Sequence, residues 1–217
     1  VGRGDHVLLR LGTTLECLVA ILGSLKIGAV PMPTSFLLRE QELEIILRNS
    51  DAVAAVSTPE FVPPLEAVRP RCPALRHLIL TGDAAGFPSY QKLLAEASPE
   101  LTPAATGKDE PAFMVYTSGT TGEPKGVEHA QRWIIGTGDP VTKVMLRLEP
   151  RDICFQPQDW SFIYALGCNF FYPFHAGAAV VLPAGRFDPG EAFATIERYR
   201  VTVFCAVPTI YRMMLAA

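Results

Sequence analysis

Charge is sparse in this sequence of 217 residues, and neither sign dominates. Nineteen Lys and Arg residues stand against 22 Asp and Glu residues, for a net charge of −3, and no run of five like charges occurs. Proteins that bind nucleic acid or an acidic membrane surface through their charge usually carry a basic cluster. The sequence therefore argues against both classes. Proline and glycine, with 19 and 17 residues, follow no period, which excludes collagen-like and repeat architectures.

Closely spaced cysteines and histidines are also missing. None of the five cysteines belongs to a CxxC pair, and no two of the four histidines have HxxxH spacing. Structural metal sites usually have closely spaced ligands in the sequence. Disulfide frameworks usually have an even number of cysteines. We therefore expect five free, buried thiols, no metal site formed by protein ligands, and a reducing compartment, the cytoplasm.

No segment has the composition of a signal peptide or a membrane span. The opening VGRGDHVLL lacks a basic start followed by a long apolar stretch. Residues 160–185 carry no Asp, Glu, Lys or Arg, but they contain an asparagine, a histidine, two prolines and three glycines. A spanning helix needs ~20 mainly apolar residues. We expect a buried helix here, a turn at His175–Gly177, and a buried strand.

What the sequence does have is a large apolar fraction, 49%, and an alternation of strand and helix patterns. This alternation predicts an α/β fold of parallel sheets that are covered by helices on both faces. The expected strands are His6–Arg10, Ala29–Met32, Ala52–Val56, His77–Leu80, Ala112–Tyr116, Asp152–Gln156, Ala178–Leu182 and Thr202–Ala206. The expected helices are Thr13 to about Gly28, Arg39–Arg48, Glu60–Val68, Ser89–Ala97, about Val127 onward with an interruption at Gly136–Pro140, Trp160–Phe174, Asp188 onward and Thr209 onward.

Some helices also carry signals for their ends and their buried faces. Capping boxes are expected at Thr13–Glu16 and at Asp188–Glu191. The buried faces are expected to contain Leu15, Leu18, Val19 and Leu22 in the first helix, Leu43, Ile46 and Leu47 in the second, and Phe193 and Ile196 in the helix after Asp188.

The sequence predicts two subdomains, residues 1–145 and 146–217. The first would end in a glycine- and hydroxyl-rich loop with the helix that follows it, and the second would begin another α/β unit. The chain starts without Met and stops inside an amphipathic helical pattern. We therefore expect it to be part of a longer protein.

The most informative segment is YTSGTTGEPKGV, residues 116–127, which lies between a predicted strand and a predicted helix. Glycines allow a ligand to approach the backbone, hydroxyls and free N–H groups suit phosphate oxygens, and a helix N-terminus favours an anion. Lys125 adds a positive charge. The spacing fits neither GxxxxGK[ST], GxGxxG nor GxSxG. The segment predicts a polyphosphate-binding loop, and the alternative is an ordinary polar connection.

This segment resembles the phosphate-binding signature of the AMP-forming, adenylate-forming enzymes, which include acyl-CoA synthetases, aryl-CoA ligases, luciferases and peptide-synthetase adenylation domains. GDHVLL at Gly4, LGSLKIGAVPMP at Leu22, and the stretches Asp159–Gly177 and Val207–Tyr211 are similar to further blocks of that family. The pair Glu128-His129 resembles acyl-CoA synthetases of the medium-chain and broad-acid type. The resemblance implies that the chain is an incomplete N-terminal domain of such an enzyme.

The resemblance also implies an ATP-dependent acid–CoA ligase. A fatty or aryl carboxylate would attack the α-phosphorus of ATP, releasing pyrophosphate, and the thiol of CoA would then displace AMP. The positions that match those holding the β- and γ-phosphates are Thr117, Ser118, Gly119, Thr120, Thr121, Gly122 and Lys125, and Mg²⁺ would share the phosphate charge.

The chain also departs from the family pattern. It contains no adenine-binding segment, no ribose-binding motif after the loop and no C-terminal domain with its catalytic lysine. Thr81-Gly82-Asp83 has the ribose-motif sequence but precedes the loop, and we interpret it as a turn at a strand end. No catalytic residue is therefore assigned within the chain, and the chain alone is expected to be inactive.

Two weaker site candidates and two alternative functions remain open. Trp160 would line the acid pocket or belong to the core, and His129 would face the substrate or lie on a helix surface. Asp159 is expected to cap the helix beside Trp160. The alternatives to a ligase are a non-catalytic, phosphate-binding remnant and an adenylation domain that loads a carrier protein.

Overall fold

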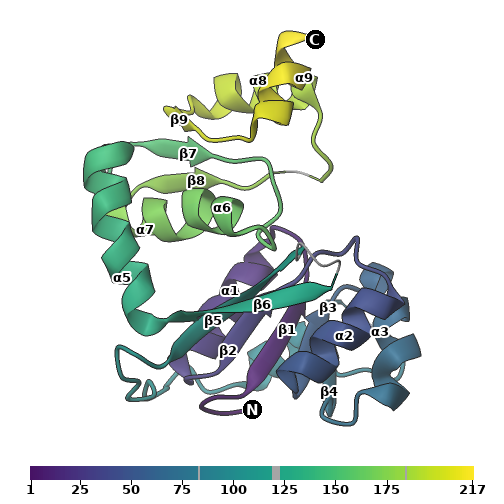
Figure 1. The fold of residues 1–217 in the computed structure, drawn as a ribbon. Coiled ribbons are helices and arrows are strands. Elements are labelled where there is room, and N and C mark those ends of the chain that lie inside the picture. The colour runs from purple at the N-terminus through teal and green to yellow at the C-terminus, as the bar shows by residue number, and fades with distance from the viewer. Residues whose placement is uncertain (83, 119–122, 184) are drawn as a thin grey trace. The chain divides into compact units, whose positions relative to one another are not determined.

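Strands and helices alternate along the chain in the computed structural model, as the sequence predicts (Figure 1). The structure describes residues 1–82, 84–118, 123–183 and 185–217. The strands are β1 (His6–Arg10), β2 (Val30–Pro33), β3 (Ala54–Ser57), β4 (His77–Leu80), β5 (Pro111–Ser118), β6 (Pro124–Ala130), β7 (Ile153–Phe155), β8 (Ala179–Val181) and β9 (Val203–Phe204). The helices are α1 (Leu15–Lys26), α2 (Glu40–Ser50), α3 (Pro63–Val68), α4 (Tyr90–Glu96), α5 (Gln131–Asp139), α6 (Ile163–Leu166), α7 (Tyr172–Ala176), α8 (Pro189–Tyr199) and α9 (Pro208–Leu215), with short 3₁₀ turns at Pro59–Phe61 and Arg69–Arg71 and π-helical segments at Pro140–Met145 and Gly167–Phe171.

The chain forms two compact units, Val1–Gln131 (unit 1) and Arg132–Ala217 (unit 2). This division rests on the contacts within each unit. It does not test the two subdomains that the sequence predicts, residues 1–145 and 146–217, which stay a prediction.

The main sheet of unit 1 is parallel, with strand order β2-β1-β3-β4. Leu8 of β1 pairs with Met32 of β2 on one side and with Ala55 of β3 on the other. The chain moves one way from β1 to β2 and the other way from β2 to β3. Because parallel crossovers are right-handed, this reversal places α1 on one face of the sheet and α2 with α3 on the other (Figure 1). Helices cover both faces, as predicted.

The core of unit 1 lies between the sheet and α2 and α3. Leu43, Ile46 and Leu47 of α2 are fully buried, as the spacing of these residues predicts. They pack with Leu8, Val30, Met32, Ala55, Leu65, Val68 and Leu78, among other residues. Strands buried on both faces are typical of parallel sheets, which explains why their sequences are almost continuously apolar.

The buried face of α1 differs from the expected one. Cys17, Ile21 and Ser24 are buried, whereas Leu15, Val19 and Leu22 are exposed. Apolar residues occur on all sides of this helix, so spacing alone does not choose a face. The cap is also shifted by one residue, because Thr14, and not Thr13, accepts a hydrogen bond from the Cys17 backbone N–H at 3.3 Å.

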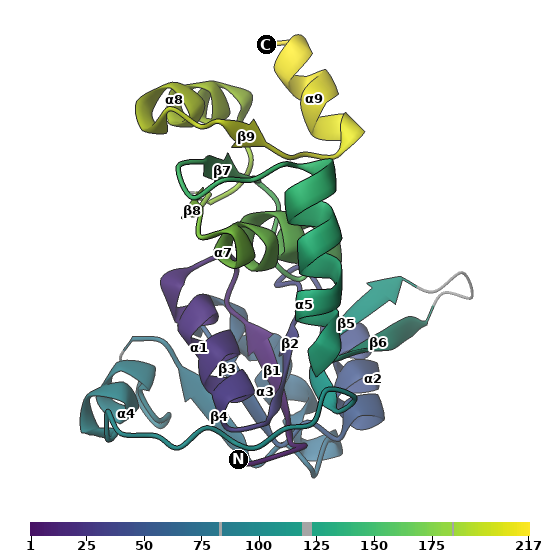
Figure 2. The same ribbon diagram turned by 90° about the vertical axis from the view of Figure 1, so that its left-hand side faces the viewer.

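The segment expected to be helical from about Val127 is a strand, β6, which pairs antiparallel with β5 (Figure 2). Helix α5 begins only at Gln131 and continues into the π-helical segment Pro140–Met145, without the interruption expected at Gly136–Pro140. The helix prediction was wrong because β5 offers β6 a row of backbone partners from Phe113 opposite His129 to Ser118 opposite Pro124, and, beyond a bulge at Ala112, Pro111 lies opposite Ala130. Pairing with a buried strand outweighs the weak helix preference of these residues.

Unit 2 is built around a parallel sheet of order β8-β7-β9. Its core is aromatic: Phe170 lies 5.7 Å from Trp160, 4.6 Å from Phe171 and 5.1 Å from Phe174, measured between ring centroids. The Asp188 carboxylate caps α8, as expected, by accepting from the Glu191 N–H at 2.9 Å.

The remaining expectations for unit 2 have mixed outcomes. Ala192 is the buried residue of α8, and Phe193, which we expected to be buried, is 48% exposed. His175 still belongs to α7, and the turn comes at Gly177, whose φ is +73°.

All five cysteines are free and buried, as predicted. No helix among the described residues has both the length and the apolar character that crossing a membrane requires. Within the same residues, no group of His, Cys, Asp or Glu side chains is arranged to hold a metal ion.

Candidate functional site

The candidate site is the end of the β5–β6 hairpin, where the glycine- and hydroxyl-rich segment joins the two strands. Thr117 lies opposite Lys125, and Ser118 lies opposite Pro124. Residues directly opposite each other in an antiparallel pair point to the same face of the ribbon, with Cβ atoms about 4.5–5.5 Å apart. The Thr117 hydroxyl and the Lys125 ammonium are both exposed and share one face at this end of the hairpin.

Four of the predicted phosphate-binding residues, Gly119, Thr120, Thr121 and Gly122, lie outside the described residues. Ser118 is the last residue of β5. The structure therefore brings together Thr117 and Lys125 from the predicted set, at the two ends of the loop. These two groups offer a hydroxyl donor and a positive charge, which suit an anion such as a polyphosphate.

On the other face of the hairpin, side chains of β5 pack over a glycine of β6. Gly126 lies opposite Tyr116, and a Cβ atom at Gly126 would lie 2.9 Å from Met114 Sδ and 3.0 Å from Tyr116 Cζ. The missing side chain thus leaves room for Met114 and Tyr116 to lie across β6. This packing fixes the two strands against each other immediately before the loop.

Tyr116 also joins the hairpin to α2. Its hydroxyl donates a hydrogen bond to Asn49 Oδ1 at 2.7 Å, and its ring packs against the core of unit 1. Burial raises the pKa of Tyr116 above its usual value, so the phenol stays protonated and remains a donor near neutral pH. Sequence reasoning missed Tyr116 and Asn49 as positioning residues because they are 67 positions apart and no local pattern links them.

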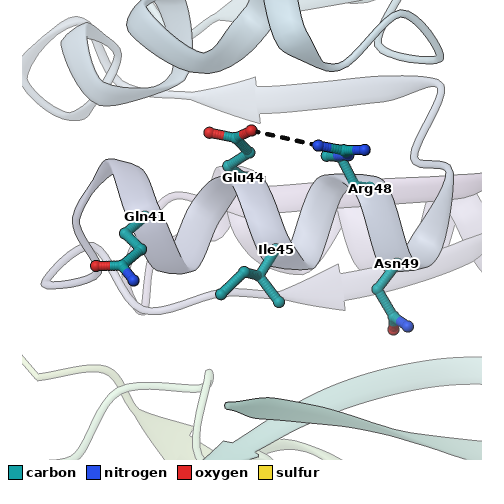
Figure 3. A pocket seen from close by; sticks show the side chains of 5 residues that line it. All are labelled: Gln41, Glu44, Ile45, Arg48 and Asn49. Atoms are coloured by element: carbon teal, nitrogen blue, oxygen red, sulfur yellow. Dashed lines mark ion pairs between the residues drawn. The ribbon is translucent and has the colours of Figure 1, made fainter. Parts of the chain in front are cut away.

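A hollow of about 480 Å³ lies along the outer face of α2 (Figure 3). It is lined by Gln41, Glu44, Ile45, Arg48 and Asn49. Glu44 forms ion pairs with Arg48 at 3.6 Å and with Arg71 at 2.7 Å. Arg48, at the same hollow, is thus paired with a carboxylate of its own helix. Asn49 lies at one end of the hollow and accepts the hydrogen bond from the Tyr116 hydroxyl.

His129 lies on β6 and not on a helix, which corrects the expected location. Its ring stacks on Phe113 with 4.5 Å between ring centroids. Burial lowers the pKa of His129, which favours the neutral imidazole. His129 shares a ribbon face with Lys125, but four residues along a strand correspond to ~13 Å. A contact between His129 and a substrate stays a prediction.

Trp160 is 1% exposed and belongs to the aromatic core of unit 2. This supports the core interpretation, and a contact with an acid stays a prediction. Asp159 does not cap α6, because its carboxylate accepts from the Ser161 N–H at 2.8 Å and its carbonyl accepts from the Phe162 N–H at 3.1 Å. Asp159 closes a turn before the helix, which starts at Ile163.

Because the loop leads into strand β6 and not into a helix, its electrostatic attraction for an anion differs from the expectation. The N-terminus of a following helix was expected to favour an anion, but no helix follows the loop directly. The Lys125 charge, the hydroxyls and the backbone N–H groups remain as the groups that can bind phosphate.

The fold is that of the N-terminal domain of adenylate-forming enzymes. The chain matches the structure of the anthranilate CoA ligase AuaEII in complex with anthranoyl-AMP with a TM-score of 0.95 and 29% sequence identity, over 100% of this chain and 42% of that one. The family model of AMP-binding enzymes matches residues 1–217. The chain belongs to this family.

Relatives of known name are CoA ligases and acyl-CoA synthetases. The benzoate–CoA ligase of Thauera aromatica is 34% identical over 212 residues, which are 98% of this chain and 40% of the relative. The mitochondrial acyl-coenzyme A synthetase ACSM3 of Pongo abelii is 30% identical over 98% of this chain and 37% of the relative. The chain thus spans about 40% of the length of the curated relatives that it matches.

Proposed function

We propose that this chain is part of an ATP-dependent acid–CoA ligase, to which it contributes the polyphosphate-binding loop. The observation that carries the proposal is the hairpin of β5 and β6, which presents Thr117 and Lys125 on one face at the two ends of the YTSGTTGEPKGV loop. Membership of the AMP-binding enzyme family supports it. The loop has no helix at its exit, so its affinity for phosphate rests on Lys125, hydroxyls and backbone N–H groups.

In this proposal the chain's residues stabilise the leaving pyrophosphate. The acid's carboxylate attacks the α-phosphorus of ATP, and negative charge increases on the β- and γ-phosphates as the bond to the α-phosphate breaks. Lys125 and Thr117 face that charge, and hydrogen bonds from fixed donors stabilise it most when it is fully developed. Mg²⁺ bound to the phosphates would share the charge. The acyl-AMP then reacts with the thiol of CoA, giving the thioester and AMP.

We further propose an aryl or fatty acid as substrate. This proposal takes the segment after Trp160 to lie beside the acid; it contains Phe162, Ile163, Leu166, Phe170 and Phe171 and not a single charge. The ammonium group of an amino acid would find no partner among these side chains, and burying an uncompensated charge is costly. The names of the benzoate– and anthranilate–CoA ligases support an aryl acid. The five free cysteines support a cytoplasmic location.

A substrate panel tests this function. The protein that carries this chain is incubated with ATP, Mg²⁺, CoA and either benzoic acids, C2 to C12 fatty acids or amino acids, and AMP and acyl-CoA are measured. The account predicts a higher kcat/KM for an aryl or fatty acid than for any amino acid. A preference for an amino acid, with transfer to a carrier protein, would establish the carrier-loading alternative. Absence of AMP release with every acid would establish the non-catalytic remnant.

Two further arms of this experiment concern the boundaries of the site. The chain 1–217 alone spans about 40% of its relatives, and we expect it to release no AMP above background. The variant Trp160→Ala tests the acid pocket. A larger change in acid preference than in the KM for ATP would place Trp160 at that pocket, and equal changes would leave it a core residue.

A further inference from the structure

Two glutamines follow β7 at the point where the chain leaves the sheet of unit 2. Gln156 is the residue after the last one of β7, and it is fully buried although its side chain carries an amide. Burying an amide whose polar atoms have no partner costs free energy. Both ends of the Gln156 amide do have a partner, and in each case the partner is Gln158.

The hydrogen bonds between these two residues fix the direction in which each amide points. The backbone N–H of Gln158 donates to Gln156 Oε1 at 2.6 Å. Because a backbone N–H can only donate, the Gln156 atom that faces it must be the oxygen. Gln156 Nε2 therefore faces the Gln158 side chain and donates to Gln158 Oε1 at 2.8 Å. The Gln158 Nε2 group is thus directed away from Gln156, and no described residue accepts from its two N–H donors.

Neighbouring residues hold the Gln158 amide in place. Pro157, which is buried between the two glutamines, has a φ angle fixed by its ring. On the other side, the Asp159 carboxylate accepts from the Ser161 N–H at 2.8 Å and closes the next turn. Gln158 itself is half-buried, and its Nε2 atom is accessible to solvent. The Nε2 group is therefore a pre-organised donor, which loses little side-chain entropy when an acceptor binds to it.

This donor lies at the edge of the sheet where parallel α/β folds bind ligands. From β7 the chain crosses to β8 on one side and then back to β9 on the other, so α6 and α7 lie on one face of the sheet and α8 on the other (Figure 1). Ligands bind outside the carboxyl ends of the strands where the order reverses in this way. The ends of β7 and β9 are adjacent, because the Cys205 N–H donates to the Phe155 carbonyl at 3.1 Å. Gln156 and Gln158 follow directly from this end of β7.

The proposed function takes the acid to lie beside the segment after Trp160, which begins shortly after Gln158, and the inference made here rests on that function. We propose that the Gln158 Nε2 group selects aryl acids whose ring carries an acceptor oxygen, such as a methoxy or hydroxyl group. Pockets for small molecules are mostly apolar, and a few fixed polar groups decide which ligand binds and how it is oriented. Gln158 is thus a specificity-determining residue, and Gln156 is a positioning residue that sets the direction of the Gln158 amide.

A ring substituent suits this donor better than the carboxylate of the acid does. The carboxylate is the nucleophile of the proposed reaction, and a hydrogen bond to it stabilises the acid before the attack on ATP. Such a bond strengthens binding of the ground state without accelerating the reaction. A hydrogen bond to an oxygen on the ring, in contrast, orients the acid and leaves the carboxylate free to react.

Pairs of acids that differ only in the acceptor test the proposal. Methoxy- and ethylbenzoic acids are nearly equal in size, but only the methoxy group has an oxygen that accepts a hydrogen bond. The value of kcat/KM is measured for both acids, with the substituent in the ortho, meta or para position, in the protein that carries this chain, with ATP, Mg²⁺ and CoA. The wild-type protein should prefer the methoxy acid at one of these ring positions by roughly two- to tenfold, which is the effect of one neutral hydrogen bond.

Three variants separate the donor from the residue that orients it. Gln158→Glu keeps an oxygen that accepts from Gln156 Nε2 and replaces the outward Nε2 group by a second oxygen, so the methoxy-to-ethyl ratio should fall to one or below. Gln158→Met should abolish the preference. Gln156→Leu should reduce it although Gln158 is unchanged, because the amide is then free to turn. The ratio cancels effects that are common to both acids, such as partial unfolding, and the KM for ATP should stay at its wild-type value.

Gln91→Met is the matched control, because Gln91 Oε1 also accepts from a backbone N–H, that of Gly82 at 2.7 Å, but in unit 1. It should keep the wild-type ratio. Equal losses for both acids in Gln158→Met would overturn the proposal, because the donor would then serve the carboxylate that every acid has. Turnover of both acids without a methoxy preference in the wild type would overturn it and leave the proposed ligase intact, whereas absence of AMP release with every acid would overturn both. If Gln156→Leu does not fold, the two Gln158 variants decide.

Discussion

Arg10 shows how a single charged residue can organise a set of loops. Arg10 is 2% exposed, and among the described residues its side chain donates four hydrogen bonds, all to backbone carbonyls. The acceptors are Phe61 at 3.0 Å, Ser35 and Phe36 at 2.7 Å, and Leu38 at 2.9 Å. Burial lowers the pKa of Arg10, but the arginine stays charged at neutral pH. The guanidinium therefore connects the end of β1 to the segments before α2 and before α3.

Replacing Arg10 should be much more costly than replacing an exposed arginine. Arg10→Met leaves four carbonyls without their donor, and hydrogen bonds to a charged group contribute about 1.5–3 kcal/mol each. We expect a loss of at least about 3 kcal/mol in the free energy of unfolding, measured in urea. Arg71→Met, which removes an exposed ion pair with Glu44, should cost much less, because exposed ion pairs are screened by solvent and contribute little. Equal losses for the two variants would show that the Arg10 contacts do not stabilise the fold.

Gly126 and Gly23 differ in the space around them, and this difference gives a matched pair of substitutions. A methyl group at Gly126 would press on Met114 and Tyr116, so Gly126→Ala should destabilise the protein by roughly 1–3 kcal/mol. Gly23 lies in the exposed face of α1, where an added Cβ meets nothing within 4 Å. Gly23→Ala should stabilise the protein by about 0.5–1 kcal/mol. Thermal unfolding measures both, and a stabilising Gly126→Ala would refute the packing described for the hairpin.

At the scale of elements, the position of most strands and helices could be predicted from the sequence. Short apolar runs predicted the parallel strands, and the spacing of Leu43, Ile46 and Leu47 predicted the buried face of α2. The face of α1 could not be predicted in this way because it is apolar all round. Tertiary contacts select Cys17 and Ile21, which pack inward, over Leu15 and Val19.

The hairpin is the element where local reasoning failed. Residues from Val127 to Ala130 have no strong preference, and their conformation depends on pairing with β5. A glycine at 126, with Val127 and His129 on the face opposite to Glu128, was the available signal for a strand. The candidate site itself was predictable in part, because the loop motif is local. Its support by Asn49 was not, because that contact joins residues distant in the sequence.

The contact between the hairpin and α2 should matter for ATP more than for the acid. Tyr116→Phe removes the hydroxyl that binds Asn49 but keeps the ring. We expect the KM for ATP to rise roughly two- to tenfold, which corresponds to about 0.5–1.5 kcal/mol for one hydrogen bond, with an unchanged KM for the acid. Tyr90→Phe removes a hydroxyl with a 3.5 Å contact to the Glu16 carbonyl and serves as the control. Equal increases in both KM values would limit Tyr116 to a structural role.

At the scale of the whole molecule, the sequence placed the chain in its family through one loop and several shorter blocks. The family match over residues 1–217 and the TM-score of 0.95 confirm that placement. The chain spans about 40% of the length of the relatives that it matches, and the activity of the whole protein stays a proposal. Binding of the polyphosphate by the loop is therefore the part of the proposed reaction that substitutions in this chain can test.

Acid-dependent exchange of pyrophosphate with ATP measures that part directly. Lys125→Ala in the protein that carries this chain removes the charge at the end of the loop, and Lys108→Ala removes an exposed lysine outside the hairpin. A charged hydrogen bond of about 1.5–3 kcal/mol corresponds to a roughly 10- to 100-fold slower exchange. The account predicts this loss for Lys125→Ala and wild-type exchange for Lys108→Ala. Wild-type exchange in Lys125→Ala, with native unfolding behaviour, would contradict the claim that the β5–β6 loop binds the polyphosphate.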